Sequence, residues 1–245
     1  MKPSWDRQNR GQKSCPQPTI MDYKITTIQP DVLMIEEQEY VEHCNIFVVF
    51  YKSECLIFDP GVGLIDLKKV LAPFGITKYA VCLTHSHFDH IGGLRLFKTS
   101  EACAPNKIVH NIKKRCFGLE YLKERDFALH AGYQAILQLF QSFSFEVQEC
   151  HASLAFGRFR FNLINLPGHT DDSYVYYDQN NGILVSGDVI YRGKLYFDEK
   201  NRRKYLKSLN SLEELKVKLV LPGHNEILSE PAFRKVLKED IALLS

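Results

Sequence analysis

Apolar residues occur along the chain in short runs separated by polar or glycine-containing turns, a pattern typical of β-strands. In the N-terminal half this pattern predicts strands at Tyr23–Ile28, Val32–Glu36, Asn45–Tyr51, Cys55–Phe58 and Tyr79–Thr84. In the C-terminal half it predicts strands at Phe145–Cys150, Arg158–Leu166, Tyr174–Tyr177, Ile183–Ser186 and Leu219–Leu221. We expect one further short strand between these groups, at Ile108–His110.

Helical spacing of apolar residues marks the segments between and after the strands. It predicts helices at Leu64–Phe74, Ala131–Phe143, Arg202–Leu215 and Ala232–Leu244. Strands therefore cluster in each half of the chain, and each half closes with helices. This order indicates an α/β protein in which two sheets pack face to face with helices on the outside.

Thr84 to His90 brings several metal-ligand residue types into one short stretch. Its sequence is Thr-His-Ser-His-Phe-Asp-His, so three imidazoles and one carboxylate are close neighbours. Crowding such groups into a folded interior is costly unless each has a partner, because burial removes them from water. A divalent cation would be that partner, since imidazole and carboxylate are good ligands for zinc, iron and manganese. The stretch follows an expected strand, where α/β proteins usually place their chemistry.

More ligand-type residues follow short apolar runs and stand beside glycine or proline. They are Asp59, His169, Asp188 and His224. Because a turn after a strand can bring distant parts of a sequence to one rim of a sheet, we expect these residues to share a site with the Thr84–His90 stretch. The remaining histidines stand alone in the sequence, and we expect none of His43, His110, His130 and His151 to be a metal ligand.

Length and charge limit the classes of function. The chain has 245 residues, of which 45% are hydrophobic, and this composition suits one large domain or two small ones. A net charge of +2 gives no general case for nucleic-acid or anionic-membrane binding. No apolar run approaches the ~20 residues of a membrane span. Residues 1–20 are polar and contain several prolines, so we expect a disordered N-terminal tail and a domain at 21–245.

The seven cysteines bear on the cellular compartment of the protein rather than on a disulfide-stabilised fold. Their number is odd and they form no close pairs, which argues against a disulfide framework. We therefore expect a reducing, cytoplasmic location.

The motif His-x-His-x-Asp-His, followed in order by His169, Asp188 and His224, resembles the metallo-β-lactamase-fold superfamily of metal-dependent hydrolases over roughly residues 22 to 230. The sequence Pro-Gly-His-Thr-Asp-Asp-Ser at 167–173 is similar to the branch that contains glyoxalase II and other thioesterase-like members. The resemblance implies a four-layer αββα sandwich of the metallo-β-lactamase fold, with metal ions at its open edge.

The resemblance also implies a role for each ligand-type residue. It assigns one metal to His85, His87 and His169 and a second metal to Asp89, His90 and His224, with Asp188 bridging the two. The expected ions are two divalent metals, Zn²⁺ first, with Fe or Mn as alternatives. Asp59 is expected to orient a ligand or a loop rather than to bind metal.

Such a site suits hydrolysis. Two cations acidify a shared water, and the resulting hydroxide attacks a carbonyl carbon whose oxygen is polarised by one metal. Asp89 is the expected catalytic residue, because it can orient that hydroxide and carry its proton. No serine or cysteine nucleophile is required.

The long stretch between His90 and His169 is where we expect substrate specificity to arise. We expect a helical insert at about 105–143 that carries lysines and arginines interleaved with aromatic residues. These could contact an anionic thiol carrier such as glutathione or coenzyme A, or they could form a solvated helix face. The predicted reaction is hydrolysis of a small-molecule thioester or related activated acyl ester.

Other functions share parts of this pattern. A lactonase or β-lactamase uses the same core chemistry, although the lack of a secretory signal disfavours a β-lactamase. A mononuclear-iron persulfide dioxygenase would need only the equivalents of His85, His87 and His169. Nuclease relatives need clamps or inserted domains that this sequence lacks, and the complete set of ligand positions disfavours a non-catalytic binding module. The sequence leaves the oligomeric state open.

Overall fold

Two β-sheets form the centre of the molecule in a computed structural model that describes residues 23–38, 43–120, 131–150 and 152–245. The first sheet has the order β1-β2-β3-β4-β5-β6-β7. Its strands are β1 Tyr23–Gln29, β2 Val32–Glu37, β3 Asn45–Tyr51, β4 Glu54–Phe58, β5 Lys78–Cys82, β6 Ala102–Ala104 and β7 Gln148–Glu149. The second sheet has the order β13-β12-β11-β10-β9-β8. Its strands are β8 Ser153–Phe156, β9 Phe159–Asn165, β10 Tyr174–Asp178, β11 Ile183–Gly187, β12 Leu219–Pro222 and β13 Leu228–Ser229.

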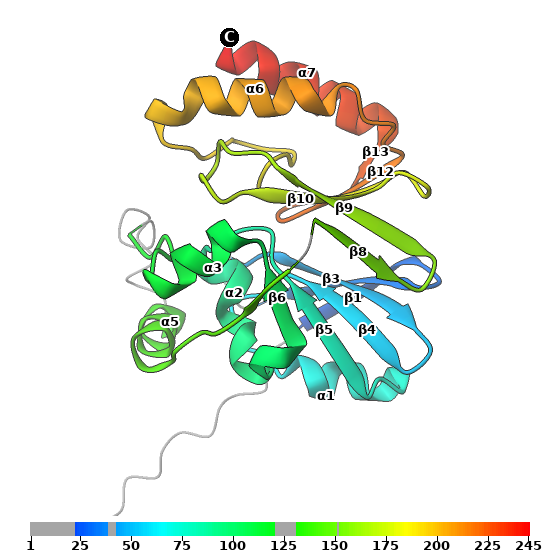
Figure 1. The fold of residues 1–245 in the computed structure, drawn as a ribbon, viewed down its shortest axis with the longest axis vertical. Helices are drawn as coiled ribbons and strands as arrows, with labels where there is room; N and C mark the ends of the chain where they lie inside the picture. Colours follow the sequence, from blue (N-terminus) through cyan, green and yellow to red (C-terminus); the bar gives the residue numbers. More distant parts are fainter. Residues whose placement is uncertain (1–22, 39–42, 121–130, 151) are drawn as a thin grey trace, which may run out of the picture.

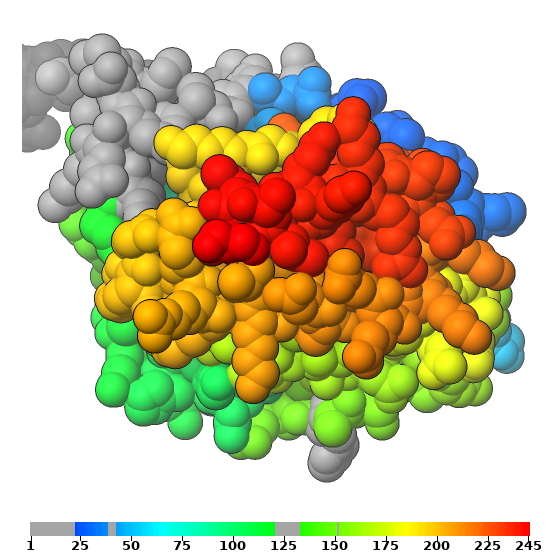
Figure 2. Space-filling view, turned by 90° about the horizontal axis from the view of Figure 1, so that it is seen from above, coloured from blue at the N-terminus to red at the C-terminus, as the bar shows by residue number. Residues whose placement is uncertain are grey.

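Helices cover the outer face of each sheet (Figure 1). They are α1 Leu67–Leu71, α2 Phe88–Ile91, α3 Asn106–Lys113, α5 Ala131–Ser142, α6 Arg202–Leu212 and α7 Glu230–Leu244. The first four lie on the side of the first sheet, whereas α6 and α7 lie together over the second (Figure 1). Figure 2 shows α6 and α7, in orange and red, covering that face of the molecule. The predicted αββα sandwich is therefore confirmed.

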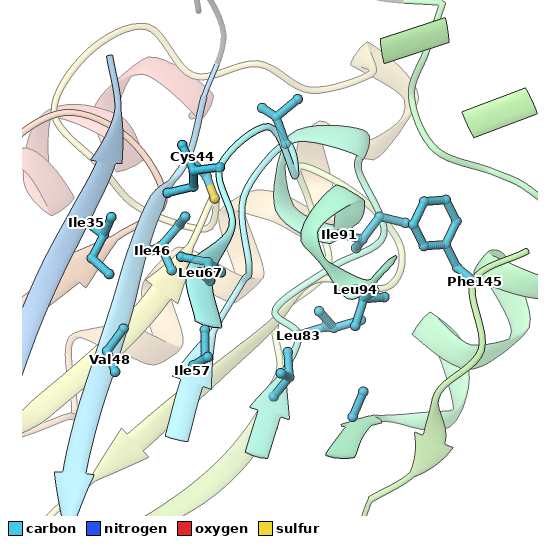
Figure 3. Close-up of a cluster of buried hydrophobic side chains, with 14 of the residues drawn as sticks. Ile35, Cys44, Ile46, Val48, Ile57, Leu67, Leu83, Ile91, Leu94 and Phe145 are labelled. Atoms are coloured by element: carbon cyan, nitrogen blue, oxygen red, sulfur yellow. The ribbon is translucent and has the colours of Figure 1, made fainter. Parts of the chain in front are cut away.

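Alternation along the strands explains why there are separate cores. In β3, Ile46 and Val48 point to the cluster between the first sheet and its helices, whereas Phe47 and Val49 point to the cluster between the sheets. Figure 3 shows the outer cluster, with Ile46, Val48 and Ile57 on neighbouring strands. Tyr205 of α6 belongs to a third cluster, between the second sheet and its helices. Each fully buried large apolar side chain contributes roughly 1.5–3 kcal/mol to folding.

Both sheets contain parallel strands. In the first sheet β4, β5, β6 and β7 pair in parallel, and in the second sheet β11 pairs with β12 in parallel. The carboxyl ends of paired parallel strands lie side by side, so the residues after them meet at one edge of the sheet. In this chain those residues belong to the turn at Asp59, the Thr84–His90 stretch, Asp188 and His224.

The segment between His90 and the second sheet differs most from the sequence prediction. Ile108–His110 was expected to be a strand, and this is wrong: the residues lie inside α3, where Ile108 and Ile112 pack into the core one helical turn apart. The expected strand Phe145–Cys150 reduces to Gln148–Glu149, because Phe145 packs among aromatic rings instead. The expected tail at 1–20 and part of the expected insert, residues 121–130, lie outside the described residues.

The helix expected at Leu64–Phe74 is shorter than predicted. It begins at Leu67, because the Asp66 side chain accepts a hydrogen bond from the Lys69 backbone N–H and caps the first turn. The segment ends in a 3₁₀ turn at Gly75, whose φ of 73° is the left-handed conformation that favours glycine. Within the described part of the chain, no helix has the length and apolar character needed to cross a membrane.

Candidate metal centre

The seven side chains expected to bind metal lie together at the edge where β4 and β5 of the first sheet and β11 and β12 of the second sheet end. The first sheet contributes four of them, from the loop after β5 and from α2; the second sheet contributes three, from the loops after β9, β11 and β12. They are His85, His87, Asp89, His90, His169, Asp188 and His224. The structure places them in one cluster.

The cluster contains two triads that share no residue, and a third group, His85, His90 and Asp188, overlaps both. The potential ligand atoms of His85, His87 and His169 all lie within 4.8 Å of one another. The same limit holds for Asp89, His90 and His224. These are the two sets that the sequence resemblance implies for two separate metals.

Asp188 lies between the triads. Its Oδ2 atom is 3.4 Å from His169 Nε2, in one triad, and 3.2 Å from His224 Nε2, in the other. Its Oδ1 atom is 3.3 Å from His90 Nε2. One carboxylate thus faces both triads, as a bridging ligand would.

Neighbouring groups fix the orientation of three imidazole rings. His169 Nδ1 lies 2.6 Å from the backbone carbonyl oxygen of Tyr196. A carbonyl oxygen only accepts, so Nδ1 carries the hydrogen and Nε2 keeps its lone pair toward the cluster. His90 is held in the same way, with Nδ1 2.9 Å from Asp59 Oδ2. His85 Nδ1 lies 3.1 Å from Thr84 Oγ1.

Asp59 ties the two halves of this network together. Its Oδ1 accepts the Thr84 backbone N–H at 2.7 Å, and its Oδ2 accepts the Thr84 hydroxyl at 2.6 Å as well as His90 Nδ1. Because the Thr84 hydroxyl donates its hydrogen to Asp59, its oxygen is left to accept from His85. Asp59 therefore orients His90 directly and His85 through Thr84, in line with the expectation that it orients a ligand.

Orphaned polar atoms show that the cluster fits metal ions. His85 Nε2, His90 Nε2 and Asp188 Oδ1 are buried and have no hydrogen-bond partner among the described residues. Leaving such atoms unpaired costs about 1–3 kcal/mol each, which a cation would relieve. Imidazole nitrogens with carboxylate oxygens suit Zn²⁺, Fe or Mn.

Two histidines of the first triad, His85 and His87, are held neutral, as metal ligands must be. Burial, and then the nearby His169, lowers the pKa of His87 to about 3. Burial, and then His90, lowers the pKa of His85 well below its usual value.

The second triad contains charge in need of compensation. Burial opposes protonation of His224, but the Asp188 and Asp89 carboxylates outweigh it and raise its pKa to about 10. Burial likewise opposes ionisation of Asp188, yet His224 and His90 bring its pKa well below its usual value. In this arrangement protonated imidazole balances the negative charge of the buried carboxylates, and a bound divalent cation can balance that charge instead.

Sequence reasoning missed Glu37, which fixes the turn that carries Asp59. Glu37 is the last residue of β2 and is buried. Its carboxylate accepts backbone N–H groups from Val62 at 2.8 Å, Leu64 at 3.0 Å and Ile65 at 3.4 Å. Burial raises the pKa of Glu37, and these three hydrogen bonds oppose that rise. The only sequence signal was an acidic residue at the end of an apolar strand.

Two close backbone approaches also escaped the sequence analysis. A Cβ at Gly118 would lie 2.6 Å from His87 Cδ2, and a Cβ at Gly223 would lie 2.3 Å from Asp188 Oδ1. The loop around Gly223 is further held by Asn45 of the first sheet, whose side-chain amide donates to the carbonyl oxygens of Pro222 at 3.0 Å and Asn225 at 2.8 Å. Both loops therefore pack directly on ligand-type side chains.

Of the histidines expected not to bind metal, His43 and His110 lie within the described residues. His43 affects the buried Glu37 electrostatically, and His110 lies on α3, where it lines a separate cavity. His130 and His151 lie outside the described residues.

Known proteins match both the sequence and the fold. The family model of the metallo-beta-lactamase superfamily matches residues 40–224. A Bacillus subtilis protein named "Probable metallo-hydrolase YqgX" is 28% identical over 189 residues, which cover 76% of this chain and 83% of the relative. The Gallus gallus "Acyl-coenzyme A thioesterase MBLAC2" is 27% identical over 220 residues, covering 79% and 77%. A metallo-beta-lactamase family protein from Thermus thermophilus has the same fold, with a TM-score of 0.68 at 18% identity over 89% of this chain and 80% of that chain.

Proposed function

Because the chain belongs to the metallo-β-lactamase superfamily, we propose that this metallo-hydrolase cleaves a thioester or a related activated acyl ester of a small molecule with two divalent metal ions. The observation that carries the proposal is the position of Asp188 between two complete triads. A single-metal oxygenase would need only one triad, and the second would then be an unexplained cluster of buried polar groups. Two triads that share a carboxylate support a dinuclear site.

We assign His85, His87 and His169 to one metal, Asp89, His90 and His224 to the other, and Asp188 to both. Two bound cations would lower the pKa of a water molecule and polarise the carbonyl group of the substrate. The protein positions these groups in advance. Asp59 and the Tyr196 carbonyl oxygen hold the imidazoles of His90 and His169 in fixed orientations, so little rearrangement is needed on binding.

Asp89 is the proposed proton acceptor. Burial opposes its ionisation, but His90 and His224 keep its pKa well below the usual value, so it is a carboxylate at neutral pH. Its Oδ2 atom lies 3.4 Å from His90 Nε2 and 3.3 Å from His224 Nε2, at the heart of the second triad. A carboxylate in this place can hold the attacking water in position and take up its proton.

Thioesters are the favoured substrate class for a chemical reason and a comparative one. A thiol has a pKa of about 8.5, so the thiol group of a thioester can leave as a thiolate without a proton donor. This suits the proposed site, which provides proton acceptors and cations rather than a dedicated acid. The Gallus gallus relative, which this chain matches over most of its length, is named an acyl-coenzyme A thioesterase.

A metal analysis combined with a substrate panel tests the proposal. Protein purified without added metal should contain close to two divalent ions per chain and should hydrolyse acyl thioesters faster than nitrocefin or simple lactones. Asp188→Asn should reduce both metal content and turnover by at least about tenfold, whereas the exposed Glu214→Gln should change neither. One iron per chain with persulfide-dependent oxygen uptake would contradict the proposal, as would turnover that survives complete removal of metal.

A further inference from the structure

Tyr205 and Ser208 lie one turn apart on α6, against the two loops of the second sheet that carry His169 and Asp188. Tyr205 is fully buried, and its hydroxyl donates to the backbone carbonyl oxygen of Asp188, 3.1 Å away. The Ser208 hydroxyl donates to the carbonyl oxygen of Pro167 at 2.7 Å. One face of a single helix therefore contacts both of these loops.

The peptide groups on both sides of the Asp188 Cα atom are fixed by hydrogen bonds. On one side, the Gly187 carbonyl oxygen accepts the Gly223 backbone N–H at 2.8 Å. On the other side, the Asp188 carbonyl oxygen shares the hydroxyl hydrogen of Tyr205 with the Val189 carbonyl oxygen, which is 2.9 Å from that hydroxyl. Because the two planar peptide groups that flank a Cα atom fix the direction of its Cα–Cβ bond, Tyr205 and Gly223 together determine where the Asp188 carboxylate lies.

The Tyr205 hydroxyl keeps its proton at neutral pH. Burial, followed by the charges of Tyr191 and Asp188, raises the pKa of Tyr205 well above its usual value. An ionised phenol would lose the only hydrogen that it can donate and would place a negative charge beside carbonyl oxygens. Tyr205 is therefore a constant hydrogen-bond donor to the turn at Asp188.

The ring of Tyr205 supports the residues around His169. A Cβ at Gly168 would lie 2.2 Å from Tyr205 Cγ, so the backbone just before His169 packs directly on the ring. The ring also contacts Phe197 edge to face, with centroids 5.6 Å apart. Phe197 follows Tyr196, whose backbone carbonyl oxygen orients the His169 imidazole. Tyr205 thus supports both the backbone of His169 and the segment that orients its side chain.

We propose that Tyr205 is a positioning residue of the metal centre, which holds the carboxylate of Asp188 and the imidazole of His169 at a fixed separation. That separation is 3.4 Å, from Asp188 Oδ2 to His169 Nε2. Tyr205 is not one of the seven ligand-type side chains, and it acts through the backbone of Asp188 and the packing around His169. Asp59 and Tyr196 orient imidazole rings, whereas Tyr205 relates ligands from different loops. The assignment rests on the proposed two-metal function.

Tyr205→Phe tests the role of the hydroxyl, because it removes that group and keeps the ring on Gly168. Competition with a chromophoric chelator measures the affinity of the full-length protein for Zn²⁺. We expect this affinity to fall about tenfold, at the lower end of the range for residues that support metal ligands, since Tyr205 acts through the backbone. Circular dichroism at the temperature of the titration checks that the variant is folded.

Tyr177→Phe is the matched control. Tyr177 is buried in the same apolar cluster as Tyr205, and its hydroxyl donates to the Lys216 backbone carbonyl oxygen at 3.2 Å. Lys216 precedes β12, so this contact lies at the opposite end of that strand from His224. Both variants lose a buried hydroxyl and should melt at a lower temperature, but only Tyr205→Phe should bind Zn²⁺ less tightly. Wild-type affinity in Tyr205→Phe, or equal losses of affinity in the two variants, would overturn the proposal.

The magnetic interaction between two bound Mn²⁺ ions gives a readout that depends neither on turnover nor on overall stability. Full-length wild-type protein loaded with Mn²⁺ should show a spin-coupled pair by electron paramagnetic resonance, because Asp188 is the proposed bridge between the ions. At saturating Mn²⁺, Tyr205→Phe should show a smaller coupled fraction and more isolated ions, whereas Tyr177→Phe should match the wild type. Unchanged coupling in Tyr205→Phe would show that the hydroxyl does not set the position of the bridge.

The same measurements separate the role of Tyr205 from the proposed function. Wild-type protein that binds two coupled ions but hydrolyses no thioester would refute the proposed reaction, and the role of Tyr205 would still be decided by affinity and coupling. Wild-type protein that binds one ion would refute the two-metal function. In that case, equal affinities of Tyr205→Phe and Tyr177→Phe for the single ion would separately refute the role of Tyr205.

Discussion

His90 donates its Nδ1 hydrogen to Asp59 Oδ2 across 2.9 Å, so a residue at the end of β4 determines how a side chain on α2 faces the metal centre. The same carboxylate holds Thr84 by two hydrogen bonds, at its backbone N–H and its hydroxyl. Neighbouring parallel strands thus fix each other's loops through one buried acid. The affinity of the proposed metal centre should therefore depend on Asp59, which is not one of its proposed ligands.

Asp59→Asn should weaken metal binding about 10- to 100-fold, the range typical for removal of a group that orients a ligand histidine. An asparagine presents either an N–H or a neutral oxygen to His90 and therefore supports its orientation less well. Competition with a chromophoric chelator measures the change. Asp66→Asn is the control, since Asp66 caps α1 away from the cluster and asparagine caps helices about as well as aspartate, so metal affinity should stay unchanged. Equal metal affinity in the two variants would contradict this role for Asp59.

Removal of the metal ions should abolish hydrolysis and lower the melting temperature together. Binding to the folded state alone adds stability that grows with the ratio of free metal to Kd, about 4 kcal/mol at a thousandfold excess. The reason is visible in the cluster, where buried nitrogen and oxygen atoms lose their partner. Calorimetry before and after dialysis against a chelator, followed by addition of Zn²⁺ or Mn²⁺, measures the effect. A melting temperature that is unchanged by chelation would exclude the proposed centre.

Gly118→Ala should disturb the first triad. Gly118 has a φ of 67°, and an added Cβ would lie 2.6 Å from His87 Cδ2. The left-handed backbone alone costs roughly 1–2 kcal/mol for alanine, and the contact should displace His87 as well. Gly75→Ala is a closely matched control, because its φ is 73° and nothing lies within 4 Å of the added Cβ. Both variants should lose stability in urea, but only Gly118→Ala should lose metal from the His85, His87 and His169 triad.

Asp240 should make stability depend on pH. It is buried on α7, and burial, followed by the charge of Glu239, raises its pKa from 3.8 to about 7. The folded state therefore holds this proton more tightly than the unfolded state. Its effect on the free energy of unfolding is absent below the unfolded pKa and becomes increasingly unfavourable as the pH rises to about 7.

Asp240→Asn removes this penalty, so its stability relative to wild type should improve by about 2 kcal/mol between pH 5 and pH 8. Urea unfolding of both proteins at the two pH values, with chelator present throughout, gives the difference directly. Glu239→Gln, an exposed neighbour, should show a much smaller dependence. A constant difference between Asp240→Asn and wild type at the two pH values would show that Asp240 is ionised in the folded protein.

The layered fold and the membership of the metal cluster were predictable because their signals are local. A continuous apolar run marks β3, and alternating apolar residues mark β9. Residues of metal-ligand type, such as His85 and His169, stand out because they follow the ends of strands. The ligand roles themselves remain proposals. Sequence reasoning failed where tertiary contacts decide the structure. Ile108 lies in a run too short to show its helical period, and it became helical through packing of α3 on the core.

The supporting residues were hidden for a related reason. A glutamate at the end of a strand normally faces water, and only the returning turn at 62–65 makes Glu37 a buried acceptor. Gly118 lies in an irregular segment and closely approaches His87 of the metal-ligand motif. No sequence spacing predicts that these two residues meet. Asp172 belongs to the 167–173 motif, but the lack of a hydrogen-bond partner for its carboxylate among the described residues is apparent only in three dimensions.

Asn45 begins β3 of the first sheet, yet its backbone N–H donates to the Gly223 carbonyl oxygen and its side chain to the carbonyl oxygens of Pro222, at the end of β12, and Asn225, in the loop that follows. Strand pairing in one half of the chain is thereby joined to the placement of His224 in the other. If the backbone were cut between β7 and β8, each fragment would retain only part of the ligand set. Restored uptake of two metal equivalents on mixing the fragments would then report their reassembly more directly than any measure of secondary structure.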